Sequence, residues 1–181
     1  MTRIAFIDRA DMDEEQGRAW DTALATSGVV VGPFSAYIRL PKLFEAAQHI
    51  RSCLYAGPLS DRERQIVHVL VARNFGAEYP WYSQTQGALR AGLDRAFIDA
   101  INARRVPDLP DPRERTCYEV GRELLETRIL SAESYATAEK ILGTNDLIAL
   151  VVTAGNFSTV CLAANAFDMD PPAANPIPLE P

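Results

Sequence analysis

Apolar residues recur at helical spacing along most of the chain, and no segment shows the sustained apolar and polar alternation of a half-buried strand. Residues that favour helix starts precede these runs, and Gly or Pro residues follow most of them. The clearest start is Ser60, because Glu63 three residues later completes a capping-box pattern. The pattern predicts an all-α fold of about seven or eight helices, which begin near Asp11, Pro41, Ser60, Glu78, Leu93, Asp111, Ser131 and Leu147.

Polar side chains interrupt two of these predicted helices, and we expect the chemistry of the protein there. The third helix is apolar nearly all round, which predicts burial on several sides. Gln65 and His68 interrupt it, and their spacing of three residues places them on one face. In the fourth helix, one side carries Pro80, Trp81 and Gln84.

The segment 147–167 has no charged residue in twenty-one positions, a length sufficient to cross a bilayer. A membrane span is nevertheless not expected, because Thr, Asn, Ser and Gly residues interrupt the segment. Its flanks carry Asp146 and Asp168 in place of the Lys or Arg residues that anchor a span. A long uncharged helix of this kind is typical of one buried by neighbouring helices and by another subunit. We therefore predict a homo-oligomer with no membrane partner.

A chain of 181 residues with 48% apolar and 23% charged residues is expected to form a single globular domain. Residues 1–10 are expected to form a loose arm, and residues 168–181, with five prolines, an extended tail. The net charge of -6 and the scattered basic residues argue against a nucleic-acid partner. No positively charged and apolar leader opens the sequence, which predicts a cytoplasmic location.

The cysteine and histidine residues give no metal or disulfide pattern. Cys53, Cys117 and Cys161 are far apart and show no C-x-x-C spacing, so we expect small buried hydrophobic side chains rather than redox thiols. The only histidines are His49 and His68, too few for a zinc site. We predict no metal and no cofactor.

Three motifs together resemble a known family. The run 62–93, RERQIVHVLVARNFGAEYPWYSQTQGALRAGL, contains an E-Y-x-W turn and an A-x-x-A-G-L ending. The run 130–167, LSAESYATAEKILGTNDLIALVVTAGNFSTVCLAANAF, and the G-P-F turn that begins at Gly32 complete the pattern. These features resemble the carboxymuconolactone decarboxylase and AhpD-like family over about residues 32–178. The resemblance implies a single AhpD-like helical domain in residues 1–181 and a homo-oligomer, commonly a trimer or a hexamer.

The resemblance also implies where the site lies. Peroxidase-type members carry a glutamate, a C-x-x-C motif and a histidine, and these positions fall on Gln65, on Ala77 and Pro80, and on Gln84. An amide donates and accepts hydrogen bonds but does not shuttle a proton at neutral pH. A pocket is implied between the two helices that carry these positions. The candidate catalytic residues are His68, Glu78, Gln84 and Gln65, and the candidate substrate-binding residues are Trp81, Tyr82 and Asn156.

Each candidate also has a purely structural interpretation. The two glutamines can bond each other or buried backbone groups, and Glu78 can be a residue that only favours a helix start. His68 and the aromatic rings can belong to the core.

Three functions are therefore open. The resemblance implies a cofactor-free lyase or isomerase that acts on a small carboxylated lactone or a related ring compound, with His68 or Glu78 as proton carrier. The alternative is a catalytically degenerate member that binds a small molecule or only assembles. A thiol peroxidase is less favoured, because the cysteine motif is absent.

Overall fold

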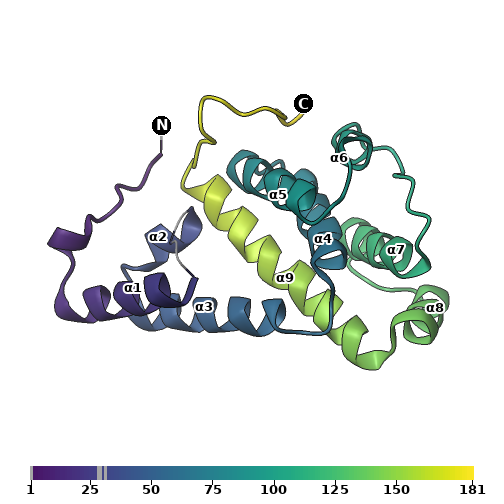
Figure 1. Ribbon diagram of the computed structural model, residues 1–181, viewed down its shortest axis with the longest axis horizontal. Helices are drawn as coiled ribbons and strands as arrows, with labels where there is room; N and C mark the ends of the chain where they lie inside the picture. Colours follow the sequence, from purple (N-terminus) through teal and green to yellow (C-terminus); the bar gives the residue numbers. More distant parts are fainter. Residues whose placement is uncertain (1, 28–29, 31) are drawn as a thin grey trace.

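The computed structural model describes residues 2–27, 30 and 32–181, and within these ranges it contains nine α-helices, a short 3-10 turn and no strand. Figure 1 shows their arrangement. The helices are α1 (Glu14–Ser27), α2 (Pro33–Tyr37), α3 (Pro41–Tyr55), α4 (Asp61–Asn74), α5 (Glu78–Arg90), α6 (Arg95–Asn102), α7 (Pro112–Thr127), α8 (Ala132–Leu142) and α9 (Thr144–Ala166).

The all-α prediction is confirmed, and the helix that the sequence pattern did not predict is α2. Its five residues are too few to show helical periodicity. Pro33 occupies the first turn, where a proline costs no hydrogen bond, and Gly32 precedes it with a φ of 61°. The predicted G-P-F turn therefore continues into a short helix.

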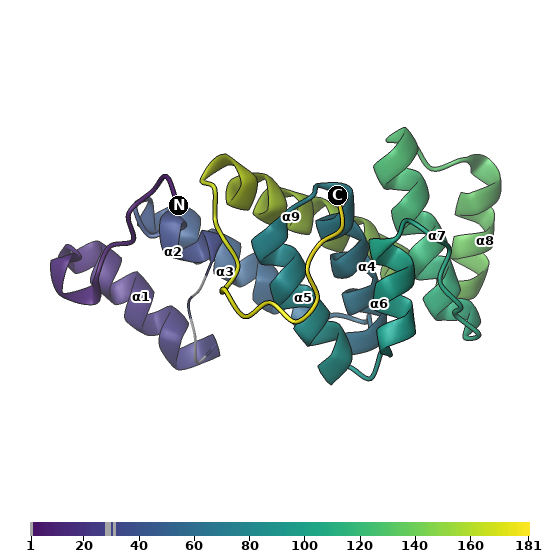
Figure 2. The same cartoon turned by 90° about the horizontal axis from the view of Figure 1, so that it is seen from above.

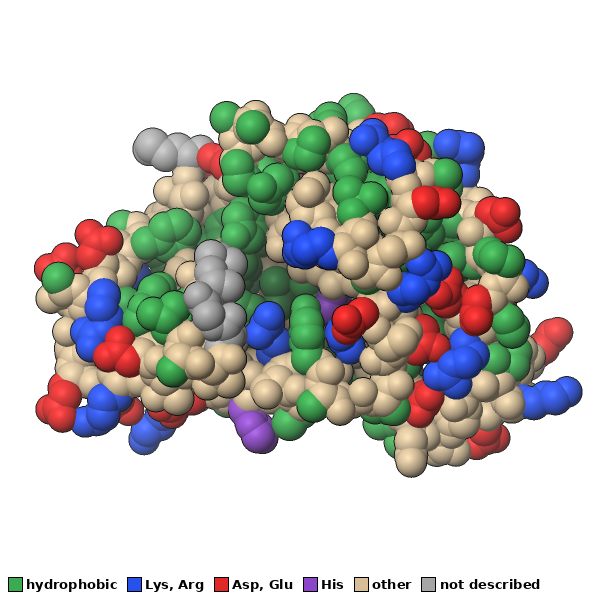
Figure 3. Space-filling model, viewed as in Figure 1, with side chains coloured by type: hydrophobic (Ala, Val, Ile, Leu, Met, Phe, Trp, Pro, Cys, Tyr) green, Lys and Arg blue, Asp and Glu red, His purple; other side chains and the backbone are tan. Residues whose placement is uncertain are grey.

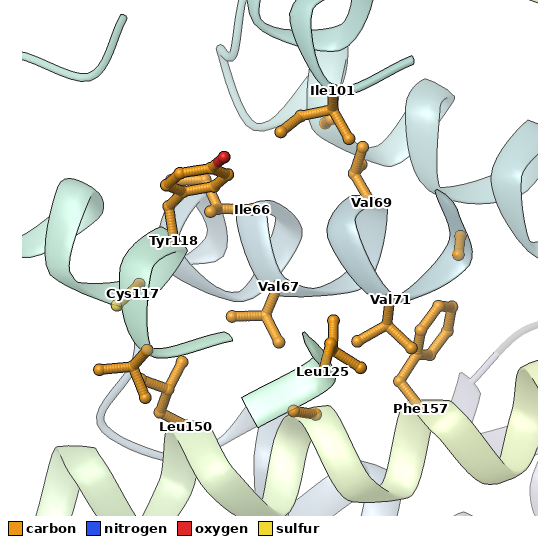
Figure 4. Close-up of a cluster of buried hydrophobic side chains, with 14 of the residues drawn as sticks. Ile66, Val67, Val69, Val71, Ile101, Cys117, Tyr118, Leu125, Leu150 and Phe157 are labelled. Atoms are coloured by element: carbon orange, nitrogen blue, oxygen red, sulfur yellow. The ribbon is translucent and has the colours of Figure 1, made fainter. Parts of the chain in front are cut away.

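Helix α4 lies at the centre of the molecule and packs against α5, α6, α7 and α9. Its predicted capping box is present: the Ser60 amide donates to Glu63 Oε2 at 2.8 Å, and the Glu63 amide donates to Ser60 Oγ at 3.2 Å. Contact with several helices explains why α4 is apolar nearly all round. Figure 4 shows Val67 and Val71 directed toward Leu150 and Phe157 of α9.

A charged network secures the start of α4 to its neighbours. The guanidinium of Arg113, on α7, donates to Glu63 Oε1 at 2.8 Å and to Asp146 Oδ2 of α9 at 2.7 Å. These bonds, led by the one to Asp146, raise the pKa of Arg113. Because Glu63 is 5% exposed, its charge requires this partner as well as the cap.

Helices α1, α2 and α3 form one end of the molecule, and α7 and α8 form the other (Figure 2). Helix α3 packs on α1 and α2, and α2 in turn contacts α9. Phe44 and Ile38, both fully buried, are at the centre of a second small core at this end. At the N-terminal arm, the Arg3 amide donates to the Phe167 carbonyl at 2.8 Å.

The proline-rich tail after α9 is extended and crosses α5 (Figure 2). Trp81 Nε1 donates to the Ile177 carbonyl at 2.9 Å, and Asn102 Nδ2 donates to the Pro178 carbonyl at 2.9 Å. The Asn102 side chain also accepts from the Glu180 amide at 2.9 Å. Ile177 itself is 2% exposed, so the tail contributes to the core.

Helix α9 is long and apolar enough to cross a membrane by length and composition, which by itself is weak evidence for a span. It begins at Thr144, three residues before the predicted start, and it contacts α2, α4, α5, α7 and α8. One side remains uncovered in the single chain. The exposed apolar residues on that side are Ile148, Val151, Val152 and Leu162.

Candidate functional site

A cavity of about 260 Å³ lies among α2, α3, α4, α5 and α9. In Figure 3, a hollow with a hydrophobic floor and basic side chains at its rim lies where α3, α5 and α9 meet in Figure 1. The polar residues of its lining include Gln65 and His68 from α4, Gln84 from α5 and Asn156 from α9. Four of the seven residues predicted from the sequence are therefore brought together.

Gln65 extends from α4 toward α5, and Gly87 makes room for it. A Cβ atom at Gly87 would lie 2.9 Å from both Oε1 and Nε2 of the Gln65 amide. The Gln65 side chain is 8% exposed, and its Oε1 has no hydrogen-bond partner in the described residues. A buried amide oxygen without a partner is costly.

His68 lies one turn further along α4, and its ring stacks on Phe157 with 4.3 Å between centroids. The imidazole is 5% exposed, and Nδ1 has no partner in the part of the chain that the structure describes. Burial, and then the positive charges of Arg64 and Arg51, lower the pKa of His68 to about 3, against a smaller opposing effect of a hydrogen bond with Gln84. His68 is therefore neutral at neutral pH.

Arg51 and Arg90 line this cavity, and neither has a carboxylate partner within 4 Å among the described residues. Arg51, on α3, places its guanidinium 4.6 Å from the centroid of the Tyr55 ring. The guanidinium of Arg64, which is nearly fully buried and pairs with Asp61, lies over the same ring at 4.2 Å. Arg90, on α5, also lines the cavity and is exposed. Unpaired guanidinium groups at a concave apolar site favour an anionic ligand.

The remaining three predicted residues lie outside the cavity lining. Glu78 is exposed in the first turn of α5, where its negative charge interacts favourably with the helix dipole. Trp81 is fully buried and binds the tail through its indole nitrogen. Tyr82 is half-buried on α5. Because Glu78 lies outside the lining and His68 is neutral, neither has the properties of the predicted proton carrier at neutral pH.

Several lining residues were not predicted from the sequence. Arg51, Tyr55 and Phe34 come from helices other than α4 and α5. Tyr79 entered the sequence analysis only as part of the E-Y-x-W turn, and Arg90 carried no signal beyond its helical position. Gly87 could have been predicted as a lining residue, because it follows Gln84 by three residues and so lies on the same face of the helix.

The structure also places the cysteines and the potential metal ligands. Cys117 and Cys161 are buried, and burial raises the pKa of each thiol to about 12. Cys53 is exposed, contrary to the prediction that all three are buried, and its Sγ lies 3.7 Å from His49 Nε2. None of the three belongs to the cavity lining. The described residues contain no cluster of three or more His, Cys, Asp or Glu side chains suited to a metal ion.

Solved structures with the same arrangement of helices identify the fold. The AhpD core of a peroxidase-related protein from Ralstonia eutropha JMP134 matches with a TM-score of 0.78 and 16% identity, over 98% of this chain and 97% of that one. The chain has the AhpD-like fold. A peroxidase-related protein from Silicibacter sp. TM1040 shares it with a TM-score of 0.77 and 18% identity, over 99% of this chain and 96% of that one.

The AhpD-like fold also occurs in the debrominase Bmp8 in complex with 2,3,4-tribromopyrrole. That structure matches with a TM-score of 0.74 and 16% identity, over 97% of this chain and 95% of that one. No protein-family profile and no curated protein sequence matches the chain.

The positions that the family resemblance singled out converge in the AhpD-like fold of this chain. Gln65, Pro80 and Gln84 line the cavity, and Ala77 is buried as the residue that precedes α5. A helix N-terminus is a position that lowers the pKa of a cysteine, but alanine stands there in this chain.

Proposed function

We propose that the cavity binds a small carboxylated ring compound and that the protein is a cofactor-free lyase or isomerase acting on it. The observation that carries this proposal is that Gln65 and His68 line one cavity and that each has a buried polar atom, Oε1 and Nδ1, without a partner among the described residues. Such atoms are rare in folded proteins, and a ligand with complementary groups explains both.

The size and walls of the cavity support a small ring as ligand. A volume of about 260 Å³ is just below the range of roughly 300–1,000 Å³ that accommodates drug-sized molecules. Phe34, Tyr79 and Phe157 supply flat apolar walls, and Arg51 and Arg90 supply the charge that pairs with a carboxylate. The complex of Bmp8 with a tribromopyrrole is an example of the same fold with a small ring compound.

Decarboxylation fits these groups because it requires electrostatic stabilisation more than a charged acid or base. The bond from the ring carbon to the carboxylate breaks, carbon dioxide leaves, and the electron pair moves into the conjugated carbonyl. The amide groups of Gln65, Gln84 and Asn156 donate hydrogen bonds to the resulting enolate oxygen. An isomerase reaction on an analogous ring uses the same donors.

The ring carbon must then receive a proton. The neutral imidazole of His68 is a poor acid, so we assign this step to the hydroxyl of Tyr79, which regains its proton from solvent. Burial and then Tyr82 raise the pKa of Tyr79 from its ordinary value, so the hydroxyl remains protonated at neutral pH. Neutral His68 instead accepts or donates one hydrogen bond and holds Gln84.

Turnover of carboxylated lactones, followed by carbon dioxide release and by ultraviolet absorbance, tests the proposal. Tyr79→Phe is expected to lower kcat by about 10²–10⁴ with little change in KM. Arg51→Gln is expected to raise KM. Glu78→Gln is the matched control on α5 and should retain activity, because its side chain lies outside the cavity lining. Full activity in Tyr79→Phe contradicts the assigned proton donor.

Binding without turnover is the second candidate. It is favoured by the absence of any carboxylate or thiol from the described cavity lining and by the low pKa of His68. In that case a carboxylated ring compound raises the melting temperature, as any ligand of the folded state does, and no product forms. If the compound raises the melting temperature of the protein but not that of Arg51→Gln, and no product forms, the cavity is a binding site and the lyase or isomerase activity is excluded.

A further inference from the structure

A second, smaller cavity of about 120 Å³ lies between α4, α7 and the C-terminal end of α6, which Figure 2 shows side by side. Leu70 follows His68 by two residues, so this cavity lies on the opposite side of α4 from the larger one. Leu70, Ile101 and Leu125 give it apolar walls beside the Tyr118 ring. Four arginines also line it: Arg73, Arg104, Arg105 and Arg122.

The positive charge around this cavity is incompletely neutralised. Glu126 also lines the cavity, and its carboxylate pairs with Arg122 at 2.9 Å. Arg104 and Arg105 have no carboxylate within 4 Å among the residues that the structure describes. A local excess of arginines is notable in a chain with a net charge of -6.

Arg73 provides a buried guanidinium that two hydrogen bonds hold in place. The residue is 5% exposed, and its Nε donates to the Asn102 carbonyl at 2.7 Å while Nη2 donates to the Pro181 backbone oxygen at 3.3 Å. Burial, and then the charge of Arg104, lower its pKa, and Glu180 opposes this shift. These two oxygens therefore hold Arg73 in place beside the cavity.

Arg104 occupies a backbone position that favours glycine. Its φ is 53°, and the turn closes with Arg104 N to Ile101 O at 3.0 Å and Arg105 N to Ala100 O at 2.8 Å. Left-handed residues at helix C-termini are usually glycine, because a Cβ atom is unfavourable there. Arg128 has the same backbone conformation, with a φ of 68°, but does not line the cavity, so it provides a matched control.

We propose that the Arg73, Arg104, Arg105 and Arg122 cavity binds a phosphoryl group, either free inorganic phosphate or the phosphate of a small ester. Several guanidinium forks at one site match an anion with three or more equivalent oxygens, which can accept from all of them at once. The apolar wall and the Tyr118 ring offer contact to a short carbon group of an ester. This site is separate from the larger cavity and does not depend on its function.

Binding is measured by isothermal titration calorimetry and by the melting temperature, with inorganic phosphate and phenyl phosphate as probes and sodium chloride at equal ionic strength as reference. Both probes are expected to bind saturably and to raise the melting temperature more than chloride does. Tighter binding of phenyl phosphate identifies an ester site, and equal or weaker binding identifies a site for the free ion.

Arg104→Gly and Arg128→Gly separate binding from stability. Both substitutions place glycine at a position with positive φ, where glycine is favoured. Both are therefore expected to leave the fold intact and to raise the melting temperature. Only Arg104→Gly is expected to weaken phosphate binding, by roughly tenfold or more for the loss of one charge-assisted contact. Equal affinity in the two variants, or stabilisation by phosphate no greater than that by chloride, overturns the proposal.

Discussion

At the scale of single residues, burial decides what the polar side chains of α4 can do. Gln65 and His68 were predicted to share one face, and they line one cavity. Their spacing did not reveal that the imidazole is stacked on Phe157 and neutral. That property depends on how much water and charge surround the ring, and both come from residues distant in the sequence.

The low pKa of His68 predicts a loss of stability in acid. Its pKa is about 3 in the folded protein against 6.5 as the ordinary value, so the unfolded chain binds the extra proton between these pH values. The contribution is fully present above pH 6.5 and is lost as the pH falls toward 3. The free energy of unfolding should drop by up to about 1.4 kcal/mol per pH unit in this window.

Urea denaturation of the protein and of His68→Gln at pH 7, 6, 5 and 4 measures this effect. The variant is expected to show a shallower fall, because glutamine does not titrate. His49→Gln is the control, since His49 is exposed on α3. Parallel stability profiles for the protein and His68→Gln contradict a buried neutral imidazole.

At the scale of elements, helix starts and ends were readable from short motifs. The capping box at Ser60 and Glu63 is present as predicted, because such motifs act within one helical turn. Contacts between elements were not readable. Trp81 had been expected at the site, but the tail supplies its hydrogen-bond acceptor, the Ile177 carbonyl, from 96 residues away.

Trp81→Phe therefore tests the attachment of the tail. Removal of the indole N–H leaves the buried Ile177 carbonyl without a donor, which should cost roughly 1–3 kcal/mol in the free energy of unfolding. Hydrogen exchange should also become faster in residues 175–181. Trp20→Phe on α1 is the matched control, because Trp20 is half-buried and far from the tail in the sequence. Unchanged exchange in the tail contradicts this role.

At the scale of the whole molecule, the uncovered side of α9 supports the predicted homo-oligomer. Ile148 is 57% exposed and Leu162 is 55% exposed, and both lie in the part of α9 after Asp146, which has no charged residue. Contiguous exposed apolar side chains usually mark a contact surface. The homo-oligomer, its subunit number, trimer or hexamer, and the cytoplasmic location remain predictions.

Val152→Glu places a charge on this side of α9 and should shift the protein to a smaller species in light scattering coupled to size-exclusion chromatography. A carboxylate buried in a subunit contact lacks a partner, which is strongly unfavourable. Val106→Glu is the control, because Val106 is exposed at 77% in the loop after α6 and lies away from α9. A monomeric unsubstituted protein, or a Val152→Glu variant of unchanged mass, contradicts an α9 interface.

The sequence by itself determined the all-α class and most helix starts, which follow from local rules: periodicity, caps and the short-range positions of Gly and Pro. The family resemblance added the expectation of a pocket between α4 and α5, and both helices line the cavity. Tertiary structure alone decided that Arg51 and Arg90 complete the cavity, that Trp81 binds the tail and that Glu78 faces solvent. The rotation of one helix against another and the burial of each side chain depend on packing between distant segments, and no local pattern encodes them.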